Sequence, residues 1–208
     1  GGTDGSYNVA VGVSALQANT EGQFNTAVGR RALYTNTTAD ENTAVGYLAL
    51  YLNQTGANNT AVGNSALQAN TASNNTAVGD RALTANTVGN LNTAVGRYAL
   101  ETNVDGSRNT AVGYGALRTF DPASATDTYN TGLGYAAGSS ITTGDLNTAV
   151  GGNTMALLTT GSRNTAVGAL ALDAASTANN NTAVGAYALT SNTSGTENVA
   201  LGNASMQG

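Results

Sequence analysis

The side chains that could do chemistry in this chain are few and scattered. Its 208 residues contain no histidine and no cysteine, and they include seven basic residues, all arginine, and twelve carboxylates. Imidazole and thiolate metal sites are therefore excluded, as is catalysis by histidine or cysteine. A serine or threonine nucleophile would need a neighbouring base, and the carboxylates are dispersed along the sequence. We expect neither an enzyme nor a bound cofactor.

Three aspartates adjoin turn glycines and are the candidate calcium ligands: Asp4, Asp105 and Asp145. Calcium-binding loops place several oxygen ligands at fixed, short spacings. None of these aspartates lies in such a loop, so solvated turn residues are the favoured interpretation. We expect no metal site.

Charge and hydropathy exclude two further classes of protein. The formal net charge is −5, whereas a nucleic-acid-binding protein needs a dense basic face to neutralise phosphates. No run of residues approaches the roughly 18 apolar positions typical of a membrane-spanning helix. We expect no nucleic-acid partner and no membrane insertion.

A repeat runs through the whole chain and must position whatever chemistry it has. The motif Asn-(Thr/Val)-(Ala/Gly)-(Val/Leu)-Gly occurs twelve times, mostly at a spacing of 17 residues. With the leading asparagine as repeat position 0, glycine occupies position 4 in every copy, alanine position 7 in ten and leucine position 8 in nine. Residues 1–208 therefore form one continuous array. The leading asparagines are Asn8, Asn25, Asn42, Asn59, Asn75, Asn92, Asn109, Asn130, Asn147, Asn164, Asn181 and Asn198.

The length and composition of the repeat predict an all-β fold. Seventeen residues are too few for a helical repeat, and β-branched Thr and Val favour strands. The glycine at position 4 indicates a corner that needs positive φ or a close backbone approach. The Ala-Leu segment at positions 7 and 8 then runs back as a second strand. We predict a parallel β-solenoid of about twelve coils, each of about 17 residues and two short strands.

Alternation along the strand places positions 1 and 3 on one face and position 2 on the other. Because Val9 and Val199 replace threonine at position 1, we predict that positions 1 and 3 point inward, with leucine at position 8 as a second apolar column. Asparagines stacked at position 0 should form a hydrogen-bonded ladder. The representative ladder residues are Asn25, Asn42, Asn59, Asn92, Gly29, Gly46, Gly63, Gly96, Val28, Val45, Val95, Leu33, Leu50 and Leu100.

Bulky residues vary at positions 5 and 6, just beyond the corner glycine. We expect them to line one edge of the solenoid as an interaction stripe for glycans, host proteins or other copies of the chain. The alternative is that a corner tolerates large solvated side chains. The stripe consists of Arg30, Arg31, Tyr47, Arg97, Tyr98, Tyr114, Tyr135 and Tyr187.

Two irregularities interrupt the spacing. One residue is missing before Asn75, and four are added before Asn130. We expect the added residues to form a loop at about 118–128, with Phe120, Asp121 and Pro122 as a candidate loop site, because loops often carry function. A neutral insertion is the alternative.

The repeat resembles a known family of surface proteins. Residues 8–12 (Asn-Val-Ala-Val-Gly) and 198–202 (Asn-Val-Ala-Leu-Gly) resemble the head repeat of YadA-like trimeric autotransporter adhesins, and the intervening Asn-Thr-Ala-Val-Gly units also resemble repeats of phage tail fibres. The resemblance implies a left-handed β-roll, three chains side by side, and a fibre or adhesin at a cell or virion surface. The coil here is longer than the usual head repeat, has leucine at position 8, and comes without coiled-coil heptads.

These observations favour a non-catalytic, extracellular fibre or adhesin module that associates with copies of itself. The alternative is an ice-binding solenoid that presents ranks of threonine. Such a face must be exposed, whereas our assignment of the strand faces buries position 1.

The two ends of the repeat also predict head-to-tail assembly. Counted within the repeat, Gly1 and Gly208 both fall at position 10, and Thr3 and Gly5 fall where threonine and glycine are common. A second copy placed after Gly208 would therefore continue the repeat nearly in register. Either the chain belongs to a longer array, or subunits stack end to end into a filament.

Overall fold

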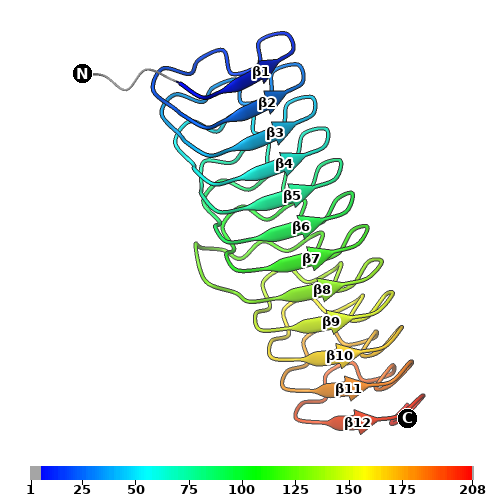
Figure 1. Ribbon diagram of the computed structural model, residues 1–208. Coiled ribbons are helices and arrows are strands. Elements are labelled where there is room, and N and C mark those ends of the chain that lie inside the picture. Colours follow the sequence, from blue (N-terminus) through cyan, green and yellow to red (C-terminus); the bar gives the residue numbers. More distant parts are fainter. Residues whose placement is uncertain (1–5, 208) are drawn as a thin grey trace.

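The computed structural model describes residues 6–207 as a rod of stacked coils (Figure 1). Its strands form one parallel sheet in the order β1 to β12, in which each strand pairs with the next in register. This arrangement confirms the β-solenoid. The strands are β1 (Val9–Val11), β2 (Thr26–Val28), β3 (Thr43–Val45), β4 (Thr60–Val62), β5 (Thr76–Val78), β6 (Thr93–Val95), β7 (Thr110–Val112), β8 (Thr131–Leu133), β9 (Thr148–Val150), β10 (Thr165–Val167), β11 (Thr182–Val184) and β12 (Val199–Leu201).

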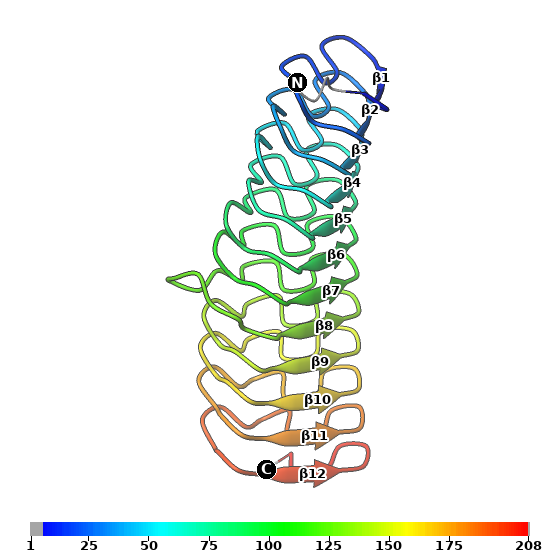
Figure 2. The ribbon, with the colours of Figure 1, turned by 60° about the vertical axis from the view of Figure 1, so that its left-hand side comes forward.

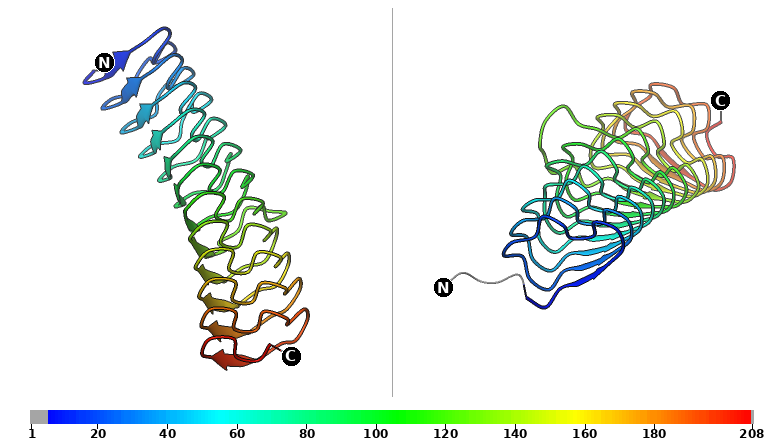
Figure 3. Two further views of the ribbon diagram at one scale, coloured as in Figure 1. Left: turned by 90° about the vertical axis from the view of Figure 1, so that its right-hand side faces the viewer. Right: turned by 90° about the horizontal axis from the view of Figure 1, so that it is seen from above.

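The coil is left-handed. In Figure 1 the strands run from left to right while the chain descends from its N-terminal end. Turning the molecule about the vertical axis moves the strands to the right edge in Figure 2 and to the left edge in the left view of Figure 3. The strands therefore lie on the near side in Figure 1. A chain that crosses the near side from left to right while descending winds as a left-handed helix.

Each coil has one strand, so our prediction of two strands per coil is wrong. The segment that runs back at positions 5–10 consists of turns, because positive φ at positions 6 and 8 interrupts the extended conformation; Arg31 has φ of 59° and Leu33 of 49°. Hydrogen bonds still join this segment to the next coil. The N–H of Leu33 donates to the carbonyl of Ala49 (3.0 Å), and the N–H of Thr35 donates to that of Tyr51 (3.2 Å).

The faces of the strand are the reverse of our prediction. Alanine at position 2 is fully buried from Ala27 to Ala183, and threonine and valine at positions 1 and 3 point outward. Val28 and Val95 are half-buried, and Val45 is 36% exposed. The space between the strand and the returning segment admits only a methyl group from the strand, because leucine at position 8, including Leu33, Leu50 and Leu100, fills the rest. The prediction for the leucine column is confirmed.

The glycine at position 4 is required on two counts. Gly46 has φ of +138°, and a β-carbon built on it would lie 2.3 Å from the carbonyl oxygen of Gly63 in the next coil. Gly29, Gly63 and Gly96 are equally close to the glycine below them. A side chain at this corner would clash with backbone and carry the strain of a conformation that L-residues rarely adopt.

We predict that two adjacent substitutions on β6 will separate the inner face from the outer face. Ala94→Asp should abolish cooperative folding or lower stability by several kcal/mol, because it buries an unpaired charge. Val95→Asp should cost about 1 kcal/mol or less, because its side chain points outward. Denaturant unfolding followed by circular dichroism at low protein concentration measures both. Equal destabilisation by the two substitutions would contradict the assignment of the faces.

Candidate functional site

An unbroken asparagine ladder holds the corner where each strand begins. In each coil the position-0 side chain accepts a hydrogen bond from the backbone of the next; the N–H of Asn42 donates to Oδ1 of Asn25 (3.0 Å), and that of Asn109 donates to Oδ1 of Asn92 (2.9 Å). Nδ2 of Asn42 donates to the carbonyl of Gly56 in the following turn (2.9 Å). From Asn25 to Asn181 these asparagines are buried and hydrogen-bonded within the rod, so they are structural and unavailable to a ligand.

A second buried asparagine column occupies position 11 and ends abruptly. Nδ2 of Asn103 donates to Oδ1 of Asn86 (3.0 Å), but Oδ1 of Asn103 has no hydrogen-bond partner. The next coil places Phe120 at this position, and the column continues with apolar Ile141 and Leu158. An aromatic ring cannot donate the hydrogen bond that the ladder supplies elsewhere.

Phe120 is therefore part of the core, which corrects its assignment to a candidate loop site. Phe120 and Pro122 are buried and Asp121 is half-buried, whereas residues 123–127 are exposed. The exposed part forms the green projection between β7 and β8 in Figure 2. Position 11 is asparagine in the preceding coils, so nothing in the sequence indicated that Phe120 occupies the same buried column.

The residues of the interaction stripe form separate groups of local contacts. In the first, the guanidinium of Arg30 lies 5.7 Å from the ring centre of Tyr47, and that of Arg31 lies 5.8 Å from the ring centre of Tyr34. Tyr187 is 45% exposed and lies three coils beyond Tyr135. The stripe is thus a series of local contacts along one edge.

The largest group in the stripe is built on Tyr98. Its ring meets Tyr114 edge-on at 5.7 Å, and Tyr114 stacks on Tyr135 at 5.5 Å. The guanidinium of Arg97 lies 4.4 Å from the Tyr98 ring centre and also pairs with Asp80 (3.0 Å). These cation–π and aromatic contacts stabilise the corner. Tyr114 and Tyr135 stay 42% and 59% exposed.

Two residues of this group were missed by the sequence analysis. Arg118 lies 4.7 Å from the Tyr98 ring centre and pairs through Nε with Glu101 (2.8 Å). Both occupy position 9, outside the predicted stripe. Their opposite charges at a separation of one repeat are the signal that could have identified the pair.

The outer face of the sheet is a surface that the sequence analysis placed inside. In-register pairing aligns ten threonines at position 1, from Thr26 to Thr182, beside a column of valines at position 3. Val62 and Val78 are 36% and 37% exposed, and Leu133 is 46% exposed. The face is therefore continuous, regular and largely uncharged.

The charged groups do not assemble into a metal centre within residues 6–207. Asp4, a candidate calcium ligand, and the end residues behind the head-to-tail prediction, Gly1, Thr3, Gly5 and Gly208, lie outside the described residues. Partial burial raises the pKa of the Asp173 carboxyl, opposed by a hydrogen bond from the Ala156 backbone. Asp173 lies three coils beyond Arg118 and does not belong to the tyrosine group. In the described part of the chain, no helix is long and apolar enough to cross a membrane.

Comparison of the chain with models of protein families, with curated proteins and with solved structures finds no match.

We predict that Asn92→Ala will lower the free energy of unfolding by about 1–3 kcal/mol, because it leaves the buried N–H of Asn109 without its acceptor. Asn90→Ala is the matched control; its side chain is exposed and the change should stay within about 0.5 kcal/mol. Equilibrium denaturation measures both values. Equal stability of the two variants would contradict a structural role for the ladder.

Proposed function

We propose that the chain is a non-catalytic module of an extracellular fibre or adhesin whose copies associate side by side through the outer face of the sheet. The observation that carries this proposal is the outward-facing column of valines at position 3, whose members from Val28 to Val184 are half-buried or at most 37% exposed. Soluble monomers rarely expose continuous apolar patches larger than a few hundred Å². Association would bury this column, and the regular spacing of the coils lets the faces of several copies meet around a common axis along the rod.

Three copies are the expected number, since the repeat resembles that of trimeric adhesins. The stripe of arginine and tyrosine would then lie at the rim of the assembly, available to surface glycans or host proteins. Head-to-tail stacking stays a prediction from the repeat positions of the first and last residues. A location at a cell or virion surface follows from the same resemblance and is part of the proposal.

We predict a solution mass three times the chain mass of 20.6 kDa, measured by light scattering after size-exclusion chromatography. The double variant Val95→Asp, Val112→Asp should be monomeric, because facing charges would be desolvated in the interface. Val88→Asp is the control, since Val88 is 47% exposed but lies on the opposite edge from the stripe. A monomeric native chain, or an unaffected double variant, would contradict side-by-side assembly.

The outward threonine column also supports a second candidate, an ice-binding solenoid. Our objection from the sequence was that position 1 is buried, and the exposed or half-buried threonines from Thr26 to Thr182 remove it. Adjacent threonines repeat at about 4.8 Å along the rod, and threonine and valine of one strand lie about 7 Å apart. A regular face of this kind can order water.

An ice-binding function predicts thermal hysteresis that Thr93→Tyr or Thr110→Tyr removes, because a bulky ring interrupts the regular threonine column. The same face cannot both bind ice and be buried between copies. A trimer without thermal hysteresis therefore favours the fibre, and a monomer with hysteresis favours ice binding.

A further inference from the structure

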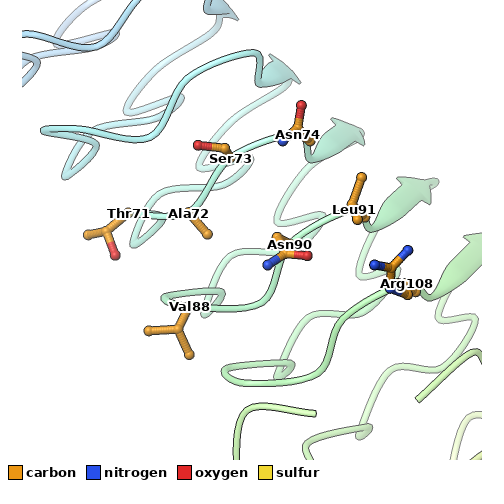
Figure 4. A pocket seen from close by; sticks show the side chains of 8 residues that line it. All are labelled: Thr71, Ala72, Ser73, Asn74, Val88, Asn90, Leu91 and Arg108. Atoms are coloured by element: carbon orange, nitrogen blue, oxygen red, sulfur yellow. The ribbon is translucent and has the colours of Figure 1, made fainter. Parts of the chain in front are cut away.

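The rod carries a groove on the edge opposite the interaction stripe. It is shallow and open to solvent, spans about 590 Å³, and is lined by the last turns of successive coils (Figure 4). The volume lies in the range of small-molecule sites, which is roughly 300–1,000 Å³. Its lining residues are Thr71, Ala72, Ser73, Asn74, Val88, Asn90, Leu91 and Arg108.

The groove arises where the residue before Asn75 is missing. In a full-length coil, Nδ2 of Asn36 donates to the carbonyl three residues later, that of Ala39 (3.1 Å). In the shortened coil, Nδ2 of Asn70 makes the same bond to a carbonyl only two residues later, that of Ala72 (2.7 Å). The missing residue is therefore position 13, between Thr71 and Ala72. Its absence opens space beside Val88, which occupies position 13 in the next coil.

The other end of the groove is fixed by the longer turn of the chain. Nε of Arg108 pairs with Asp127 of the projecting loop (2.9 Å), and its guanidinium lies 5.7 Å from the ring centre of Tyr129. The shortened turn and the lengthened turn thus lie on the same edge of the rod, with Arg108 between them. The pairing with Asp127 compensates the only charge that lines the groove.

The lining combines amide groups with apolar surface. Within residues 6–207, the side-chain amides of Asn74 and Asn90 have no protein hydrogen-bond partner, and each can donate and accept at the same time. Val88 and Leu91 expose 47% and 44% of their surface beside them. An extended peptide would instead require a free strand edge, and this edge is made of turns.

We propose that this groove binds a neutral oligosaccharide. Sugar hydroxyls donate and accept hydrogen bonds as the asparagine amides do, and the C–H faces of a pyranose ring match the surface of Val88 and Leu91. The compensated charge at Arg108 favours a neutral sugar over an acidic one. The proposal is independent of side-by-side assembly, because the groove and the outer face of the sheet involve different residues.

The test uses the full chain labelled with ¹⁵N and titrated with maltotriose, cellotriose and tri-N-acetylchitotriose. At least one of them should shift the side-chain amide resonances of Asn74 and Asn90. A threonine inserted between Thr71 and Ala72 restores the full-length coil and fills the groove without changing a lining side chain. This insertion should weaken binding at least tenfold and leave the melting temperature the same or higher.

Asn90→Ala is a second test variant. It removes an exposed amide and should weaken sugar binding without affecting folding. Asn64→Ala is the matched control; Asn64 is exposed on the stripe edge and its loss should leave affinity unchanged. The proposal is overturned if no neutral trisaccharide shifts the two amides at millimolar concentration, or if the insertion variant binds as well as the native chain. It is also overturned if the acidic trisaccharide trigalacturonic acid, titrated in parallel, binds in preference. The association state, measured separately, reports on the fibre proposal alone.

Discussion

The rod depends on a hydrogen bond that each coil can complete only through its neighbour. From Asn8 to Asn198, the backbone of one coil donates to the asparagine side chain of the coil before it, and the acceptors from Asn25 to Asn181 are buried. A shift of register would leave these groups unpaired in the interior and would move the close glycine corners, such as Gly46 against Gly63, out of line. Stability is therefore a sum over neighbouring coils. This constraint explains why both changes of length, before Asn75 and before Asn130, occur in the turns of one edge, away from the ladder-bearing strand and the glycine corner.

The surfaces follow from the same register. Identical positions repeat coil after coil, so a solvent-exposed residue type becomes a column: threonine and valine on the sheet, arginine and tyrosine on one edge. The sheet face is uniform and suits a uniform partner, such as another copy of the chain. The opposite edge is broken by the shortened and lengthened turns, and the groove lined by Val88 and Asn90 lies there. Repetition thus favours assembly, and irregularity favours recognition of a small ligand.

The spacing alone was sufficient to predict the solenoid, the corner at Gly29 and its equivalents, and the inner leucine column. It could not tell which face of the strand is inside, because alternation with a period of two is symmetric. We weighted the substitution of Val9 and Val199 for threonine, but these residues lie in the outermost coils and are 50% and 71% exposed. The informative residues were Ala94 and its equivalents at position 2. Together with alanine at position 7 and leucine at position 8, they leave no volume inside the coil for an inward valine.

The second strand was overpredicted because the sequence around Leu33 is also compatible with a strand and does not reveal the positive φ of that residue. Phe120 was misplaced because a single coil changes its column from polar to apolar.

The central functional claim is that the outer face of the sheet joins copies of the chain. The chain has no cysteine, so Val95→Cys introduces a single thiol at the middle of that face, and Val88→Cys places one on the groove edge. Under mild oxidation at low concentration, we expect Val95→Cys to form an intermolecular disulfide much faster than Val88→Cys, because assembled faces hold the thiols close together. Equal rates of cross-linking for the two variants, or cross-linking by Val88→Cys alone, would contradict the account.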